Sequence, residues 1–177
     1  MIKAEIIQEL SRAYAQYAQY IDGLTEEEFL RSVNNKWTAG QQTEHLLRSV
    51  KPLNQGLQLP RFVFRLLFGK PNRPGRTYTQ LVAKYHLKLQ AGGRASGAFI
   101  PKDVSYSQKQ ALLTALNNHV HKLQVRLTNY NEKDLDQYLI PHPLLGKLTI
   151  REMMYFTIYH VIHHQRNIQE MLQPANQ

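Results

Sequence analysis

The stretch from 149 to 172 constrains the fold of this chain more than any other. Its sequence, TIREMMYFTIYHVIHHQRNIQEML, opens on the S/T-x-x-E pattern of a capping box, formed here by Thr149 and Glu152. No Gly or Pro follows before Pro174, so the pattern predicts an unbroken helix of about six turns. One face recurs at spacings of three and four and carries Met153, Phe156, His160, His164, Ile168 and Met171.

Two histidines, His160 and His164, therefore lie in the middle of an otherwise apolar face. A single histidine in such a place is most often a core residue with one satisfied hydrogen bond. A pair at i and i+4 projects from one side of the helix about one turn apart, which is the geometry that one metal ion needs from two helical ligands. His163 lies roughly 100° around the helix, so we place it at the edge of this face. Both interpretations stay open on this helix alone, since a metal site needs a third ligand.

Composition sets the outer bounds. With 177 residues the chain can bury a substantial core, and we treat 1–177 as a single domain. It contains no Cys, which excludes disulfides and thiolate metal ligands and makes the cytoplasm the expected compartment. The N-terminal segment is typical of an amphipathic helix, not of a signal peptide. No apolar run approaches the roughly 18 residues of a membrane span, so none is expected.

The net charge of +9 and the sequence pI near 9.8 raise the question of a nucleic-acid or acidic-membrane partner. The Lys and Arg residues are scattered and form no long run. A solvated basic surface explains that distribution better, so a nucleic-acid partner is not expected.

Capping and turn signals predict the other helices. Apolar spacing indicates a first helix over 3–20, ended by Gly23. A short second helix should run to about Val33, and a long helix containing Pro52 should kink or break there. The expected N-terminal caps of the later helices are Thr25, Thr38, Thr77 (with its helix ending near Ala91) and Ser107 (with its helix ending near Asn129).

The connecting segments carry weaker signals. Pro60 restarts a helix in PRFVFRLLFGK, which could form an interfacial patch for a membrane or a partner helix, but which we expect to cover the end of the fold. GGRASGAFIP (92–101) is expected to be a flexible loop of mostly small residues, without the spacing of a phosphate-binding loop. The last connection, 130–148, shows no strand pattern, and Leu144 and Leu148 should plug the mouth of the core.

Four main helices with short accessory ones predict an all-α chain, and at this length a four-helix bundle is the simplest architecture. The stretch from 60 to 106 would be a long crossover between the second and third main helices. A bundle brings the inward faces of different helices together, so ligands far apart in sequence can meet in its core.

The third ligand should be a His, Asp or Glu on another inward face. His45 is the only histidine on the second main helix, but it lies toward one side of the apolar stripe, with Glu44 about 100° away. The remaining histidines occupy accessory, outward or loop positions: His86, His119, His121 and His142. Three neutral imidazoles would suit Zn²⁺, Ni²⁺ or another late divalent ion, and three protein ligands would leave a place for water or substrate.

The segments WTAG (37–40), EHL (44–46) and YHVIHHQ (159–165), in this order, resemble the DinB/YfiT-like superfamily. The resemblance implies an up-down-down-up four-helix bundle, often a homodimer, with His45, His160 and His164 as metal ligands. It also implies metal-dependent hydrolases or low-molecular-weight thiol transferases acting on a small-molecule substrate, although some relatives have no established activity. Arg166 and Asn167 depart from the usual Gly-Gln before the isoleucine, which bears on substrate fit more than on metal binding.

Catalytic side chains are not identified by the pattern. Glu44 and His163 are candidates for a proton acceptor, although each also fits a structural or solvated role. Gln42 and Gln165 could each hold an imidazole N–H, while two tyrosines, Tyr155 and Tyr159, are expected off the inward face. The alternative to an enzyme is a non-catalytic metal-binding or stress-associated bundle protein that acts through a dimer surface.

Overall fold

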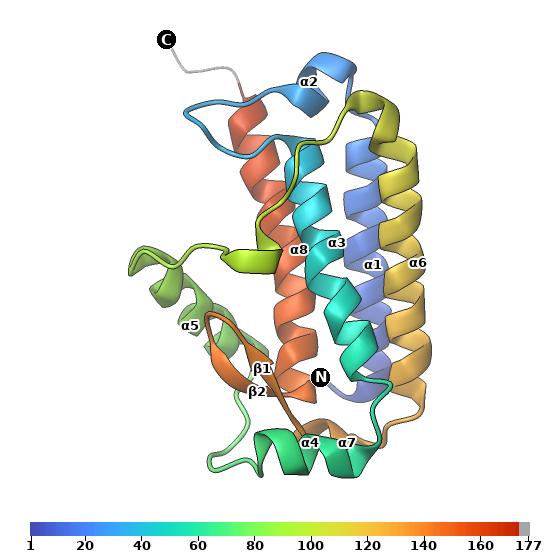
Figure 1. The fold of residues 1–177 in the computed structure, drawn as a ribbon, viewed down its shortest axis with the longest axis vertical. Helices are drawn as coiled ribbons and strands as arrows, with labels where there is room; N and C mark the ends of the chain where they lie inside the picture. The colour runs from blue at the N-terminus through green and yellow to red at the C-terminus, as the bar shows by residue number, and fades with distance from the viewer. Residues whose placement is uncertain (174–177) are drawn as a thin grey trace.

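The computed structural model describes residues 1–173, and its regular structure is almost entirely helical. Four long helices run side by side (Figure 1): α1 (Lys3–Asp22), α3 (Ala39–Gly56), α6 (Lys109–Thr128) and α8 (Ile150–Leu172). Four shorter helices and two 3₁₀ turns lie between them: α2 (Glu26–Leu30), α4 (Arg61–Phe68), α5 (Tyr78–Gln90), η1 (Gly97–Phe99), η2 (Tyr106–Gln108) and α7 (Glu132–Gln137). The prediction of an all-α fold is confirmed.

The long helices form one core. In Figure 1, α1 and α8 run upward while α3 and α6 run downward, which gives the up-down-down-up order. Each of α1 and α3 packs against both α6 and α8. The shared interior is filled by large apolar side chains that are almost completely buried, among them Ile6, Leu10, Leu46, Leu116, Leu123 and Ile168.

Side-chain caps start most of these helices where the sequence predicts. Thr149 Oγ1 accepts from the Glu152 N–H at 3.1 Å, and a Glu152 carboxylate oxygen accepts from the Thr149 N–H at 3.0 Å. Equivalent boxes form at Thr25, Thr38 and Thr77. The box predicted at Ser107 is wrong, because Ser105 and Gln108 form it instead, around η2, and α6 begins at Lys109.

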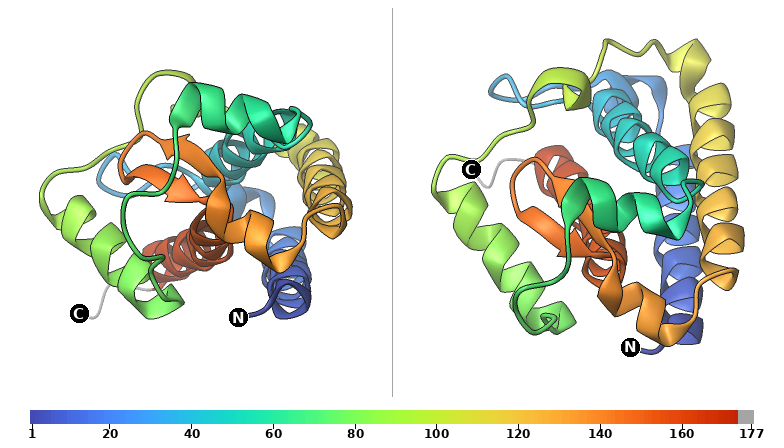
Figure 2. Two further views of the ribbon diagram at one scale, coloured as in Figure 1. Left: turned by 90° about the horizontal axis from the view of Figure 1, so that it is seen from below. Right: turned by 60° about the horizontal axis from the view of Figure 1, so that its bottom comes forward.

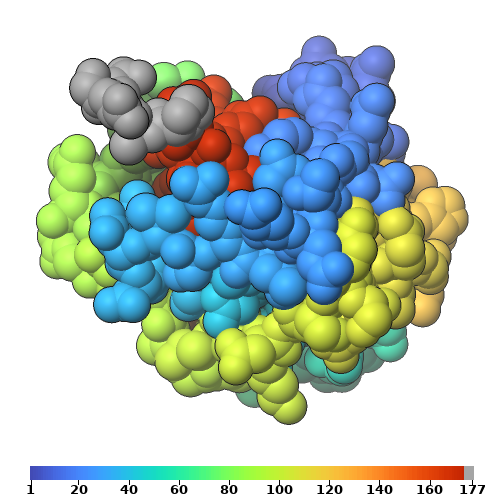
Figure 3. Space-filling model, turned by 90° about the horizontal axis from the view of Figure 1, so that it is seen from above, coloured from blue at the N-terminus to red at the C-terminus, as the bar shows by residue number. Residues whose placement is uncertain are grey.

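The upper end of the bundle explains that difference. The Lys109 ammonium donates to the carbonyls of Asp22 and Leu24 at 2.8 and 2.9 Å, so the start of α6 is tied to the end of α1. Figure 3 shows the top of the molecule covered by α2 and the segment after it, beside the start of α6. Two overlapping S-x-x-Q patterns begin at Ser105 and Ser107, and the long-range contact of Lys109 favours the one that begins at Ser105.

Proline inside α3 does not break the helix. α3 is continuous from Ala39 to Gly56 and contains Pro52, whose side chain is exposed. Proline removes one backbone hydrogen bond, but the helix continues beyond it for about one more turn. The predicted break at Pro52 is therefore wrong, while the kink, the other outcome predicted there, stays a prediction.

The last connection holds a small hairpin that the sequence did not predict. β1 (Leu139–His142) pairs antiparallel with β2 (Gly146–Thr149), and Gly146 adopts a positive φ of 77° after the turn. Each strand has four residues, and Pro141 interrupts the first, so no alternation is long enough to detect. Leu148 is fully buried, as expected of a plug, and Leu144 is half-buried.

The lower end of the bundle is covered by part of the crossover and by the hairpin. Seen from below in Figure 2, α4 and the hairpin lie across this end and α5 lies beside α8. Phe64 of α4 is buried, as a covering helix requires, but Phe62, Leu66 and Leu67 remain 69%, 79% and 59% exposed. No helix among residues 1–173 is long and apolar enough to cross a bilayer.

Glu152 has a second role besides capping α8. Its buried carboxylate accepts from both terminal guanidinium nitrogens of Arg73, at 2.7 and 2.8 Å, and from the backbone N–H of Arg76 at 2.8 Å. Burial raises the pKa of Glu152, but these donors outweigh it and lower the pKa overall. One carboxylate therefore fixes the start of α8 and the loop that leads into α5.

We expect Glu152→Gln to lower the free energy of unfolding by about 3 kcal/mol, because the guanidinium of Arg73 loses the charge that compensates it. Glu28→Gln is the matched control, since Glu28 holds the same capping position on α2 but is only half-buried. Urea denaturation of both variants measures the difference. Equal losses for the two would show that Glu152 acts as a cap alone.

Candidate metal centre

Three buried histidines from two helices converge in the bundle core. His45 comes from α3, while His160 and His164 come from successive turns of α8. His160 Nε2 lies 3.1 Å from His45 Nε2 and 3.1 Å from His164 Nε2. The potential ligand atoms of the three side chains all lie within 4.8 Å of one another. The structure thus brings together the three residues that the sequence singled out.

Hydrogen bonds fix which nitrogen faces the centre in two of the rings. His45 Nδ1 lies 2.6 Å from the Phe99 carbonyl oxygen, and His164 Nδ1 lies 2.9 Å from Gln42 Oε1. A carbonyl oxygen can only accept, so both rings carry their proton on Nδ1. The Gln42 amide is oriented in turn by donation from its Nε2 to the Trp37 carbonyl at 3.1 Å. The Nε2 lone pairs of His45 and His164 therefore point inward.

The three imidazole nitrogens are better arranged to bind a metal ion than to hydrogen-bond to one another. His160 Nε2 can donate a proton to only one neighbour, so the lone pair of the other neighbour faces, 3.1 Å away, a nitrogen with no proton left for it. Imidazole nitrogens that share a tetrahedral zinc ion stand about 3.3–3.4 Å apart, given Zn–N bonds of about 2.0–2.1 Å. The observed spacing is close to that value, and a cation would satisfy all three lone pairs together.

Burial also keeps the three rings neutral. Desolvation lowers the pKa of each histidine, and the neighbouring imidazoles lower those of His160 and His164 further. At His45 the hydrogen bond to Phe99 opposes this effect without reversing it. Neutral imidazole is the form that binds a metal.

Aromatic side chains hold the imidazoles in place. The Trp37 ring lies 5.1 Å from the His45 ring, and Phe156 stacks on His160 with ring centroids 4.7 Å apart. These contacts restrict the rotation of two rings whose orientation decides the direction of their lone pairs.

A cavity of about 590 Å³ opens beside the cluster, with His45 and His160 in its wall. The rest of the wall comes from α1, α3, α4, α5, the 94–99 segment, the hairpin and α8. Most of its side chains are apolar. A ligand in this cavity would reach two of the three histidines.

The two candidate proton acceptors lie outside the cluster. The Glu44 carboxylate accepts from Arg48 Nε, at 2.7 Å for one oxygen, and from the Lys102 N–H at 3.2 Å. His163 is half-buried at the edge of the face, as predicted, and its Nε2 lies 3.1 Å from Asn167 Nδ2. A catalytic role for either stays a prediction.

Of the expected imidazole partners, Gln42 bonds His164, whereas Gln165 makes no such bond within residues 1–173. Tyr155 and Tyr159 lie off the cluster, as predicted, but both are buried, because α5 and the N-terminus cover that side of α8. The Tyr159 hydroxyl contacts His86 Nε2 at 2.5 Å.

Two site groups were missed by the sequence. The Phe99 carbonyl comes from the segment expected to be a flexible loop, and no side-chain pattern marks a backbone oxygen. His142, assigned to a loop, lines the cavity and packs its ring 4.2 Å from that of Phe156. Its Nδ1 accepts from the N–H groups of Leu144 and Leu145, and burial lowers its pKa to about 4. The HPLL turn sequence was the available signal.

The fold and the cluster define an all-α protein with a buried three-histidine centre. A family model described as the DinB superfamily matches residues 9–168. The chain therefore belongs to the DinB superfamily, as the motifs around the histidines indicate. Curated proteins gave no significant match to the sequence.

We expect Gln42→Ala to weaken zinc binding by about 10–100-fold, since the His164 ring loses the acceptor that orients it. Competition against a chromophoric chelator measures the affinity. Gln42→Glu keeps an oxygen acceptor and should retain most of it. Unchanged affinity in Gln42→Ala would mean that packing alone holds the ring.

The metal-free protein should lose stability in acid. The folded-state pKa values of His160 and His164 lie below the unfolded value of about 6.5, so the unfolded chain takes up protons first as the pH falls. Their stabilising contribution is complete above about pH 6.5 and is lost below it, by about 1.4 kcal/mol per histidine per pH unit.

Urea denaturation of chelator-treated protein at pH 7.5 and 5.5 should therefore show a loss of about 2–3 kcal/mol from these two residues. His160→Gln should reduce that loss, whereas His121→Gln, at an exposed position of α6, should leave it intact. If the wild type and both variants lose the same stability between pH 7.5 and 5.5, the loss comes from groups other than His160.

Proposed function

We propose that the chain is a divalent-metal-dependent enzyme whose ion is held by His45, His160 and His164. The observation that carries the proposal is the convergence of their Nε2 atoms at the wall of a cavity. Three neutral nitrogen ligands suit zinc or nickel. Such an ion, when bound, supplies a Lewis acid that lowers the pKa of a water molecule or a thiol in its open position.

The placement of the ligands supports a reactive site over a closed structural one. Structural zinc usually has four protein ligands, whereas three leave a position free. His45 and His160 line the cavity and His164 does not, so the cavity would give a ligand access to an ion that these residues hold. A small-molecule substrate would enter from that side.

Between hydrolysis and thiol transfer, the cavity wall favours transfer of a low-molecular-weight thiol to an apolar electrophile. Hydrolysis generally needs a side chain that gives a proton to the leaving group. Among residues 1–173, no carboxyl group lies in this wall, and the hydroxyls of Ser49 and Thr157 donate to their own helices. Burial lowers the pKa of His142 and raises that of Tyr14, so at neutral pH the imidazole is uncharged and the phenol is a weak acid, and neither gives up a proton readily. A thiol needs only to lose its proton to become a nucleophile.

A second candidate is a non-catalytic metal-binding protein that acts through a dimer surface. The exposed apolar side chains on α4, Phe62, Leu66 and Leu67, favour it, because such side chains often mark a contact surface. The ion would then have a structural role.

Metal loading and turnover together test the proposal. Chelator-treated protein should bind one zinc or nickel ion per chain. It should then conjugate a small thiol to an apolar aryl halide, forming a carbon–sulfur bond as the carbon–halogen bond breaks and releasing halide and the thiol proton. His160→Ala should lower metal affinity by at least about a hundredfold and abolish the reaction, since one of three ligands is lost. His121→Ala should change neither.

The outcomes separate the candidates. Stoichiometric binding without turnover of any thiol or ester would favour the non-catalytic protein. Failure to bind zinc, nickel or another divalent ion would rule out both.

A further inference from the structure

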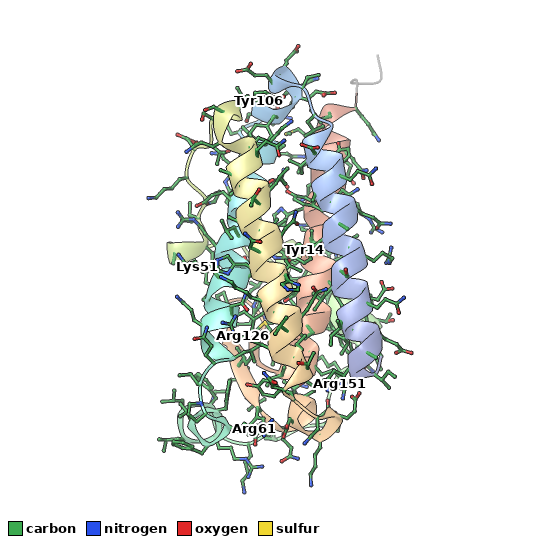
Figure 4. The ribbon with its side chains drawn as sticks, turned by 90° about the vertical axis from the view of Figure 1, so that its right-hand side faces the viewer. Tyr14, Lys51, Arg61, Tyr106, Arg126 and Arg151 are labelled. Atoms are coloured by element: carbon green, nitrogen blue, oxygen red, sulfur yellow. The ribbon has the colours of Figure 1, made fainter. Side chains whose placement is uncertain are left out.

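The cavity wall contains a polar group that the metal centre does not use, the hydroxyl of Tyr14. Tyr14 lies on α1 at mid-height of the bundle (Figure 4) and is only 2% exposed. Among residues 1–173, no group lies within hydrogen-bonding distance of its hydroxyl oxygen. Buried hydroxyls normally have a partner, because an unpaired one has given up its hydrogen bonds to water.

Two other hydroxyls in this wall, on short side chains, are satisfied locally. Ser49 donates to the His45 carbonyl at 2.9 Å, and Thr157 donates to the Met153 carbonyl at 2.8 Å. Both bonds reach back one turn of the same helix, as short side chains can. The ring of Tyr14 holds its hydroxyl far from its own backbone, so a partner has to come from outside α1.

Tyr17, one turn further along α1, shows the usual solution. It is fully buried, and its hydroxyl lies 2.8 Å from Thr43 Oγ1 on α3. Tyr14 faces the cavity region and finds no such group. Burial raises the pKa of Tyr14, so the hydroxyl keeps its proton and remains a donor.

The cavity itself restricts what could accept that hydrogen bond. Its volume of about 590 Å³ is typical of small-molecule pockets. Aromatic and aliphatic side chains form most of the wall, among them Leu53, Phe64, Phe68, Leu89, Phe99 and Phe156. A ligand with several polar groups would leave most of them unpaired against this wall.

We propose that the cavity binds an apolar molecule with one hydrogen-bond acceptor, such as an aryl ketone, and that the Tyr14 hydroxyl donates to that acceptor. The inference deepens the proposed function and rests on it for its catalytic meaning, because His45 and His160 wall the same cavity. Binding itself requires no metal. Tyr14 thereby selects ligands that carry a hydrogen-bond acceptor oxygen, while the apolar wall limits their size.

A matched pair of ligands isolates the hydrogen bond. Benzophenone and diphenylmethane share two phenyl rings and differ in the central carbonyl. Equilibrium dialysis against chelator-treated protein should give about tenfold tighter binding of benzophenone, the size of one well-formed hydrogen bond. Tyr14→Phe should bind both ligands about equally and should be no less stable than the wild type, since it removes only an unpaired oxygen.

Tyr17→Phe is the matched control on the same helix. It removes a paired hydroxyl, so it should lower the unfolding temperature and keep the preference for benzophenone. A preference that survives in Tyr14→Phe would overturn the proposal, as would failure of the wild type to bind either ligand.

This test is independent of the metal. Zinc affinity, measured separately, should be unchanged in Tyr14→Phe. If the wild type prefers benzophenone, Tyr14→Phe loses that preference and the chain binds no metal, the inference about Tyr14 is supported and the proposed enzyme is ruled out. If the chain binds zinc but does not discriminate between benzophenone and diphenylmethane, the proposed enzyme stands and the inference about Tyr14 is ruled out.

Discussion

Two hydrogen bonds decide the chemistry of the histidine cluster. A neutral imidazole has one proton and two nitrogens, so an acceptor at Nδ1 leaves the lone pair at Nε2. The Phe99 carbonyl does this for His45, and Gln42 Oε1 does it for His164. Without these acceptors either ring could present an N–H to the centre, and the three nitrogens could satisfy one another without an ion. The helices, the burial and the cavity determine only where the lone pairs lie.

The segment from Trp37 to His45 works as one unit for this purpose. Thr38 caps α3 and so fixes which residues of the helix face α8. Trp37 packs its ring against the His45 ring, and its carbonyl orients the Gln42 amide that bonds to His164. A ligand, its packing partner and the acceptor for a second ligand therefore come from fewer than three helical turns. Three contributions to the site are therefore encoded in one short stretch of sequence.

Local physics made part of this structure predictable. Capping boxes involve residues three apart, and a helical face repeats every three or four, so the helix starts and the inward direction of His160 and His164 follow from sequence. Contacts between residues far apart in sequence could not be predicted from local patterns. Such contacts select Ser105 instead of Ser107 as the cap, bring Arg73 to Glu152, and place the Phe99 carbonyl at His45. His45 was the intermediate case, because its position on the helical face left the third ligand open until the motif as a whole was considered.

Three departures from a well-packed, fully bonded core lie together at the cavity, while another, the His119 Nδ1 on α6 that is unpaired in the described part of the chain, lies apart from it. Nε2 atoms of His45 and His160 lie 3.1 Å apart, the Tyr14 hydroxyl has no partner within residues 1–173, and a cavity of about 590 Å³ is bounded by all three residues. Each feature destabilises the folded chain by itself. A binding site accounts for the features at the cavity, since a bound ion and a bound molecule would satisfy them together. The ends of the bundle, held by the buried Glu152 carboxylate and the Lys109 ammonium, supply the stability that this arrangement requires.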